Sequence, residues 1–392
     1  MIKEWFVMSH IRYFNSATIE IMQNIPNDKW QRYPSDVIPL WLASPDFLIA
    51  PEIKQALIQA VESNDLYYNS NTPAREAIVE KIKRVNEMDV TINDILICQG
   101  VDPFIWLAVR EACNPGDEVI LTDPIYGEFN NVMNPLGVKS VYWELEYSEG
   151  YKFDSEKLKE LIGPRTKAIG VCNPHNPTGR VMTGEELKVI ADIAVDHNIK
   201  VFSDELWEDI VFDAKKHVTL ASLSPEIAER TSTSWGVSKT FGVAGLYFGY
   251  ICITNKEMME GFKKYRKCIQ RGSTTLARAA APIMLDTTLD WWRREMMKHL
   301  HKIRDICLRR LNEMPGTSLP RFEGTYVPLI KFDYNMSSKE MFEYLLTEAK
   351  VALAPGSNYG SKGEGYQRIC IATSENIIEE TLNRIETAIE AL

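Results

Sequence analysis

The residue whose surroundings most favour chemistry is Lys239. It is the only charged residue in the 25-residue stretch TSTSWGVSKTFGVAGLYFGYICITN, which runs from Thr231 to Asn255. An arbitrary lysine is usually a solvated surface residue. In apolar surroundings, however, the ammonium form is desolvated, which lowers the pKa and leaves a neutral amine that can attack a carbonyl carbon. The pattern therefore predicts a lysine that forms a Schiff base with an aldehyde.

Two further polar residues follow apolar runs. Asp204 ends the run KVFSD, and Asn176 lies in CNPHNPTGR, directly after the run TKAIGVC. Side chains at the carboxyl ends of parallel strands face a common crevice, and the prolines and glycine around Asn176 indicate a fixed turn. We expect both side chains to face one cleft with Lys239, although Asp204 is also compatible with a helix cap or a loop position.

Arg368 lies in the apolar segment GYQRICIAT. A guanidinium on an apolar strand needs a planar, bidentate anion, which the carboxylate of a substrate supplies. An internal Asp or Glu is the alternative partner. Near Asn176, Cys172 is interpreted as a core thiol and His175 as a loop histidine.

Short apolar runs alternate with amphipathic stretches from residue 94 onward, which is typical of strands joined by helical crossovers. The predicted fold is α/β, with a large domain built on a mainly parallel sheet covered by helices and a smaller α+β domain. A helix over residues 289–314 connects them. The predicted division is 1–48 for an N-terminal arm and part of the small domain, 49–285 for the large domain and 286–392 for the small C-terminal domain.

Composition excludes several classes of function. The chain has 392 residues and a formal net charge of -10, which argues against a nucleic-acid partner. Its seven cysteines form no CxxC pair, so no metal site is expected, and no apolar run is long enough to span a membrane. The glycine motifs of ATP and NAD sites are absent. A cytoplasmic protein that acts on small molecules is the interpretation.

Several segments together resemble one enzyme family. NPHNPTGR, SDELWEDIVF, SKTFGVAGL, APGSNYGSKGEGYQRI and IATSENIIEETL are similar to the signature segments of fold-type I enzymes that use pyridoxal 5'-phosphate (PLP), specifically the class I/II aminotransferases. The resemblance runs in order from about residue 30 to the C-terminus. It implies PLP as cofactor, an amino acid and a 2-oxo acid as substrates, and a homodimer with shared active sites.

The resemblance also implies roles for individual residues. Lys239 carries the cofactor, and Asp204 keeps its pyridine nitrogen protonated. Arg368 binds the substrate carboxylate, with Asn176 and Ala43 beside the substrate. Further residues implied at the cofactor are Gly100, Val101, Asp102, Tyr126, Asn176, Trp207, Ser238, Tyr247 and, from the neighbouring subunit, Tyr68, for which Tyr67 is an adjacent competitor.

Four positions depart from the family pattern. Tyr247 replaces an arginine, Gly236 replaces a serine, and Trp207 replaces a tyrosine. Asp102 precedes Pro103, as in a helix N-cap, at a position where a phosphate is expected. The departures, together with KWQRYPSDVIPLWLASPDF, are similar to the carbon-sulfur β-lyase branch (cystathionine β-lyase-like proteins), which typically has histidine at position 207.

Three functions therefore remain open. Transamination is the leading prediction, β-elimination from a cysteine-type substrate is the second, and a catalytically weak regulatory protein is the third. The first two use the same Lys239. Arg271 is a candidate cation for an acidic substrate side chain or an exposed helix-end residue, and Ser273 or Thr274 is a candidate contact to the other subunit's phosphate.

Overall fold

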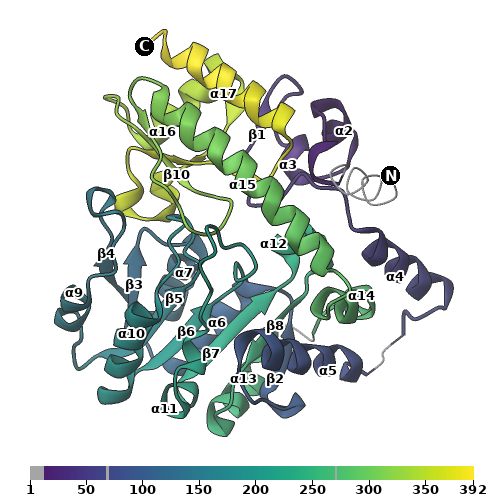
Figure 1. The fold of residues 1–392 in the computed structure, drawn as a ribbon. Helices are drawn as coiled ribbons and strands as arrows, with labels where there is room; N and C mark the ends of the chain where they lie inside the picture. Colours follow the sequence, from purple (N-terminus) through teal and green to yellow (C-terminus); the bar gives the residue numbers. More distant parts are fainter. Residues whose placement is uncertain (1–12, 68–69, 270–271) are drawn as a thin grey trace.

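A seven-stranded sheet forms the centre of the larger part of the molecule (Figure 1). The computed structural model describes residues 13–67, 70–269 and 272–392. In spatial order the strands are β2 (Ile95–Cys98), β8 (Gly249–Cys252), β7 (Thr231–Gly236), β6 (Lys200–Asp204), β5 (Thr166–Cys172), β3 (Glu118–Asp123) and β4 (Lys139–Glu144). β8 runs antiparallel to β2 and β7, and all other pairs of neighbouring strands are parallel, so the mainly parallel sheet predicted from the sequence is confirmed.

Strand β7 is not an apolar run in the sequence. Its sequence, TSTSWG, is rich in hydroxyl residues, yet its first five residues are buried. Threonine is β-branched and favours strands, and the backbone of β7 is paired on both sides by β6 and β8. This strand ends three residues before Lys239, so it places the lysine at the carboxyl end of the sheet.

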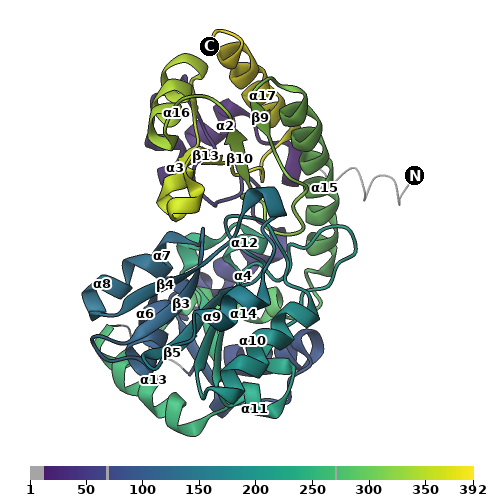
Figure 2. The same ribbon diagram turned by 90° about the vertical axis from the view of Figure 1, so that its left-hand side faces the viewer.

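Helices cover both faces of the sheet (Figure 2). On one face, Phe104 and Phe262 belong to an apolar cluster that joins two helices to β2, β3 and β6. On the other face, Leu187 and Ile190 pack with Ile120. The first face is covered by α6 (Val101–Ala112) and α13 (Lys256–Ile269), and the second by α9 (Ser155–Glu160), α10 (Gly184–Asp196) and α11 (Pro225–Ala228).

One long helix, α15 (Asp290–Glu313), connects the sheet to the C-terminal part, as predicted (Figure 1). Its buried residues recur every three or four positions, which is the spacing of one helix face. They are Trp292, Met296, Leu300, Ile303, Arg304, Cys307 and Leu311.

The C-terminal part contains a four-stranded antiparallel sheet in the order β12-β13-β10-β9. β1 (Ile38–Pro39), from the N-terminal segment, pairs with β11 (Val351–Ala352). We retain the domain boundaries 48/49 and 285/286 as a proposal. The other elements are β9 (Thr317–Ser318), β10 (Leu329–Phe332), β12 (Ala354–Pro355), β13 (Tyr366–Arg368), α16 (Ser338–Tyr344) and α17 (Glu375–Ile389).

The remaining elements connect these parts. Of the helices in the described ranges, none is both long and apolar enough to cross a membrane. The α-helices are α2 (Ile19–Asn24), α3 (Asp28–Gln31), α4 (Pro51–Glu62), α5 (Thr72–Lys81), α7 (Gly127–Asn131), α8 (Met133–Leu136), α12 (Ser238–Phe241) and α14 (Thr275–Leu285). Short 3-10 or π turns are η1 (Ile82–Asn86), η2 (Ile92–Asp94), η3 (Tyr147–Glu149), η4 (Leu220–Ser222), η5 (Ala244–Leu246), η6 (Leu345–Ala349), η7 (Gly356–Tyr359) and η8 (Ser361–Gly363).

Candidate active site

A cavity of about 230 Å³ lies where β5 and β6 end, between the large sheet and β13. Sites in parallel sheets form at this edge. Every described residue that the resemblance places at the cofactor or the substrate of the same subunit lines it, whereas Tyr67, Ser273 and Thr274 do not. Tyr68 and Arg271 lie outside the described residues. The lining residues are Leu42, Ala43, Gln99, Gly100, Val101, Asp102, Tyr126, Asn176, Asp204, Leu206, Trp207, Ser238, Lys239, Ala244, Tyr247, Phe248 and Arg368.

Lys239 lies in the first turn of α12, and its amine points into this cavity. The Nζ donates a hydrogen bond to the carbonyl oxygen of Ala43 at 2.7 Å and lies 5.5 Å from the ring centre of Trp207. Burial, with a contribution from the positive charge of Arg368, lowers the pKa of Lys239 to about 8. A substantial fraction of the amine is therefore neutral near physiological pH, as the apolar sequence around it predicts.

The backbone of Lys239 is held from the other side. Its carbonyl oxygen accepts a hydrogen bond from the Tyr326 hydroxyl at 3.3 Å, and the next carbonyl, of Thr240, accepts one from the Trp292 indole at 2.8 Å. The Thr240 hydroxyl donates to Asp209 at 2.8 Å. These bonds fix the direction in which the lysine side chain leaves the main chain.

Asp204 is a buried carboxyl at the end of β6 and is 2% exposed. Its Oδ1 accepts a hydrogen bond from the Leu206 amide at 3.0 Å, and its Oδ2 lies 4.0 Å from the Cys172 thiol. Burial raises the pKa of Asp204 to about 7, and the carboxylate of Asp102 adds to the rise. A carboxyl in this setting is stabilised in its charged form by a cation that enters the cavity.

The raised pKa of Asp204 predicts how stability depends on pH in the cofactor-free protein. In the unfolded chain this carboxyl titrates near 3.8, whereas in the folded state it holds its proton up to about pH 7. Its contribution to stability is therefore fully present below pH 4 and is lost as the pH rises to 7. Urea unfolding between pH 4.5 and 7.5 should show this loss in the native sequence and a flatter profile in Asp204→Asn. Identical profiles would contradict the assignment.

Arg368, at the end of β13, crosses to the large sheet. Its Nη1 donates to the Oδ1 of Asn176 at 3.2 Å and its Nη2 to the carbonyl oxygen of Trp41 at 3.0 Å, while its guanidinium lies 4.7 Å from the ring centre of Tyr359. The Nε is buried without a hydrogen-bond partner, and no carboxylate among the described residues pairs with this arginine. The alternative of an internal acidic partner is therefore not observed within those residues.

The start of α6 forms one end of the cavity. Gly100 is the N-cap, with φ of 111°, and a Cβ atom at this position would meet no neighbouring atom within 4 Å. The prediction that Asp102 is the N-cap is wrong, because the helix already begins at Val101. The left-handed Gly100 starts the helix two residues earlier. Asp102 instead accepts a hydrogen bond from the Tyr126 hydroxyl at 3.2 Å.

One departure from the family pattern lies in close-packed surroundings. A Cβ atom at Gly236 would lie 2.6 Å from the Cδ1 of Leu206, so a serine there would displace Leu206. Tyr247 has a left-handed backbone, with φ of 51°, and is 61% exposed. Its carbonyl oxygen accepts a hydrogen bond from the Ser273 hydroxyl at 3.0 Å.

His175 lies in the loop that follows β5, as predicted. It is fully buried, with hydrogen bonds to the hydroxyls of Thr122 at 2.9 Å and Thr178 at 2.8 Å. Burial lowers its pKa to about 3, so it is a neutral structural residue. Cys172 is a buried thiol, as predicted.

Sequence reasoning missed two contacts of Arg368. Trp41 contributes only its backbone carbonyl, which leaves no signal in the side-chain pattern. Tyr359 lies in the segment APGSNYGSKGEGYQRI, nine residues before the arginine, and an aromatic residue that close to a cation in sequence was the available signal.

Comparisons with known proteins agree with this geometry. The model of the family "Aminotransferase class I and II" matches residues 35–385. The chain is 33% identical to an aspartate aminotransferase of Pyrococcus abyssi over 90% of this chain and 91% of that protein. It is 28% identical to cystalysin from Treponema denticola, whose crystal structure contains pyridoxal 5'-phosphate, with a TM-score of 0.91 over 97% of this chain and 98% of that one.

A third relative bears on the choice of reaction. The crystal structure from Corynebacterium diphtheriae described as that of a PLP-dependent beta-cystathionase is 25% identical, with a TM-score of 0.88 over 95% of this chain and 98% of that one. The fold is therefore that of fold-type I PLP enzymes, with a mainly parallel sheet and a smaller antiparallel one. With the family model matching most of its length, the chain belongs to the class I and II aminotransferases.

Proposed function

We propose that this protein is a PLP-dependent aminotransferase, which moves the amino group of an L-amino acid to a 2-oxo acid. The observation that carries the proposal is the meeting of Lys239, Asp204 and Arg368 in one cavity. None of the three has an oppositely charged hydrogen-bond partner among the described residues. The amine of Lys239 would react with PLP, whose ring nitrogen would lie at Asp204, and the carboxylate of an amino acid would pair with Arg368.

Three observations indicate that the cavity residues fit PLP. The amine of Lys239 has a pKa lowered to about 8, which suits reaction with an aldehyde. The buried Asp204 carboxyl, with its raised pKa, suits a protonated ring nitrogen. The amides at the start of the 12-residue helix α6 suit a phosphate. When bound, PLP supplies an electron sink for negative charge at the substrate Cα.

The protein's own groups then do the remaining work. Lys239 Nζ accepts the proton from the substrate Cα, because its lowered pKa leaves a neutral base near physiological pH. Arg368 binds the α-carboxylate through a planar pair of N–H groups and so orients the Cα–H bond. Asn176 Oδ1 holds the guanidinium in place from one side, and Ala43 lies beside the amine.

The other lining residues are proposed to hold the cofactor. Tyr126 packs against the ring, and Trp207 and Ser238 offer an indole N–H and a hydroxyl. Gly100, Val101 and Asp102 supply the backbone at the phosphate end, where Tyr247 contributes a hydroxyl in place of the usual arginine. The Asp102 side chain is turned toward Tyr126, which lessens its repulsion of a phosphate.

Two finer features belong to the same proposal. We infer a homodimer in which Tyr68 reaches the neighbouring subunit's phosphate, because family members share their active sites in this way. We also place the enzyme in the cytoplasm, in line with its seven free cysteines, six of them buried.

β-Elimination is the second candidate, favoured by the similarity to the beta-cystathionase structure and by Tyr247 in place of arginine. A product assay on purified protein with acidic, aromatic, aliphatic and sulfur-containing amino acids separates the two. We expect amino-group transfer that requires an added 2-oxo acid. Release of pyruvate and ammonia from a cysteine-type substrate without an acceptor would instead establish the lyase.

The same preparation tests the third hypothesis, a catalytically weak regulatory protein. We expect a visible absorbance band that borohydride removes. A colourless protein that cannot be reconstituted with PLP would contradict the proposal.

A further inference from the structure

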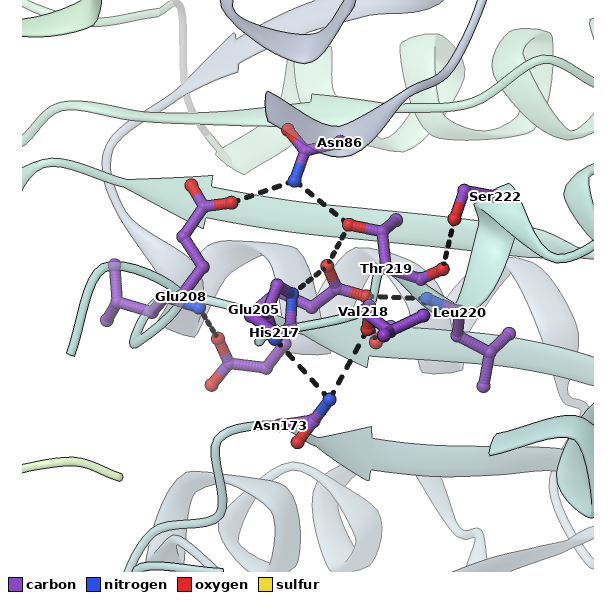
Figure 3. Close-up of polar contacts among 12 residues, drawn as sticks. Asn86, Asn173, Glu205, Glu208, His217, Val218, Thr219, Leu220 and Ser222 are labelled. Atoms are coloured by element: carbon purple, nitrogen blue, oxygen red, sulfur yellow. Dashed lines mark hydrogen bonds and ion pairs between the residues drawn. The ribbon is translucent and has the colours of Figure 1, made fainter. Parts of the chain in front are cut away.

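A buried polar network joins the segments around Asn86, Asn173 and Thr219 to the turn after β6 (Figure 3). Its centre is Glu205, the residue after Asp204, which does not line the cavity and is fully buried. All four partners of its carboxylate are donors: the Ser203 hydroxyl at 2.9 Å, the Leu220 amide at 3.2 Å, the Thr219 hydroxyl at 2.8 Å and the His217 Nε2 at 2.8 Å. A buried carboxylate with four donors is satisfied as an anion.

The hydrogen-bond directions are consistent along one branch of the network. Asn173 Oδ1 accepts from the Met182 amide at 2.9 Å, so its Nδ2 is the donor to the His217 Nδ1, at 3.5 Å. His217 Nδ1 is then an acceptor and Nε2 carries the proton that is donated to Glu205. This branch therefore links Asn173 to Glu205 through the two ring nitrogens of His217.

The second branch ends in an ion pair. The Thr219 hydroxyl, which donates to Glu205, accepts from the Asn86 Nδ2 at 2.9 Å. The same amide donates to Glu208 at 2.8 Å, and Lys81 bonds both to the Asn86 Oδ1, at 2.9 Å, and to Glu208. Burial raises the pKa of Glu208, and Lys81 opposes that rise.

The network connects the two turns that carry the proposed cofactor residues. Asn173 lies three residues before Asn176. The backbone amide of Asn173 donates to the backbone carbonyl oxygen of Asp204 at 2.9 Å. The Glu205 amide donates to the carbonyl oxygen of Ser234 in β7, also at 2.9 Å. By contrast, the Asp204 side chain has two partners among the described residues, the Leu206 amide at 3.0 Å and the weak thiol donor of Cys172 at 4.0 Å. Its direction therefore depends on the main chain that Glu205 fixes.

We propose that Glu205, assisted by His217 and Thr219, is a positioning residue that holds the turn after β6 so that Asp204 meets the cofactor's ring nitrogen. The proposal rests on the proposed PLP function. Glu205 touches neither substrate nor cofactor and acts only through the direction it gives to Asp204.

The test replaces Glu205 with glutamine in the cofactor-loaded enzyme. An amide group there turns one acceptor oxygen into a donor that faces two donors, so the turn must shift. We expect the rate of cofactor loss on dilution to rise at least about tenfold. This is the lower end of the loss of affinity, about 10- to 100-fold, that follows in metal sites when the partners that orient the ligands are removed. The kcat should fall by a similar factor, while KM for the amino acid stays within about twofold because Arg368 is held separately.

Glu208→Gln is the matched control. It changes the same residue type on the same turn and breaks the ion pair with Lys81, but leaves all four bonds of Glu205 in place. We expect a comparable loss of thermal stability with cofactor retention close to that of the native enzyme. Equal cofactor loss in both variants would show general destabilisation and overturn the proposal, as would native behaviour of Glu205→Gln.

Two variants of His217 keep the proposal testable if Glu205→Gln does not fold. His217→Leu removes one donor and should speed cofactor loss, whereas His217→Gln keeps an N–H donor and should restore retention. No difference between the two would contradict the role of Glu205. If the native protein itself neither binds PLP nor transfers amino groups, the proposed function is wrong. If the native protein is active and the variants behave as it does, only the role of Glu205 is wrong.

Discussion

Lys239→Ala is expected to lower the rate of amino-group transfer by at least about 10⁴-fold, because the substitution removes both a nucleophile and a base that acts at the substrate Cα. The Nζ lies in the cavity with one hydrogen bond, to the Ala43 carbonyl, and no other group of the described lining has both a basic nitrogen and a pKa near 8. Steady-state assays with the best donor found in the product panel measure the effect.

The fold should survive this substitution. The bonds that hold the segment involve the backbone of Lys239 and Thr240 rather than the amine, and removing a desolvated cation does not destabilise the folded state. Thermal unfolding of the variant should match that of the native cofactor-free protein. Lys331→Ala, which removes a half-exposed lysine on β10, is the control and should keep full activity. Substantial activity in Lys239→Ala would contradict the role assigned to this residue.

Arg368→Gln is expected to lower kcat/KM for the amino acid by about 10²- to 10³-fold, because two charge-assisted hydrogen bonds to the α-carboxylate are lost. The guanidinium is already oriented by Asn176, Trp41 and Tyr359, so the native enzyme loses little side-chain freedom on binding. Most of the effect should appear in KM, since the carboxylate contact exists before and during the chemistry.

Stability separates this role from a structural one. Arg368 is 5% exposed and has no carboxylate partner among the described residues, so its burial is unfavourable in the absence of substrate. The melting temperature of Arg368→Gln should therefore equal or exceed that of the native protein. Arg310→Gln, which breaks ion pairs to Glu379 and Glu386 far from the cavity, should leave kcat/KM unchanged. A fall in stability for Arg368→Gln together with unchanged KM would show that the arginine is structural.

Much of the sheet could be predicted because its strands are apolar and its crossovers amphipathic. The segments that form β3, β5 and β6 are mostly apolar and buried, and α15 shows its buried face as a repeat of three and four residues. Strand β7 was missed because four of its five buried residues are threonine or serine. In a sheet paired on both sides, burial follows from the neighbours and not from residue polarity.

The same limit applies to the site. Lys239, Asp204 and Arg368 could be found because a charge in an apolar segment is visible in sequence. The backbone oxygens of Ala43 and Trp41 could not, since any residue type supplies a carbonyl. Glu205 and His217 lie twelve residues apart, in segments rich in charge, and only the fold shows that they meet in a buried bond. Asp102 was misplaced because an Asp-Pro pair favours a cap, whereas Gly100 had already turned the chain into the helix.

The proposed function requires that the Lys239 amine bonds to the aldehyde carbon of PLP. The most direct measurement is to load the purified enzyme with PLP, reduce it with borohydride, digest it and locate the added mass by tandem mass spectrometry. We expect one pyridoxyl-labelled residue, Lys239, and loss of the visible absorbance. A label on any other lysine, or an unmodified peptide containing Lys239 from fully reduced enzyme, would contradict it.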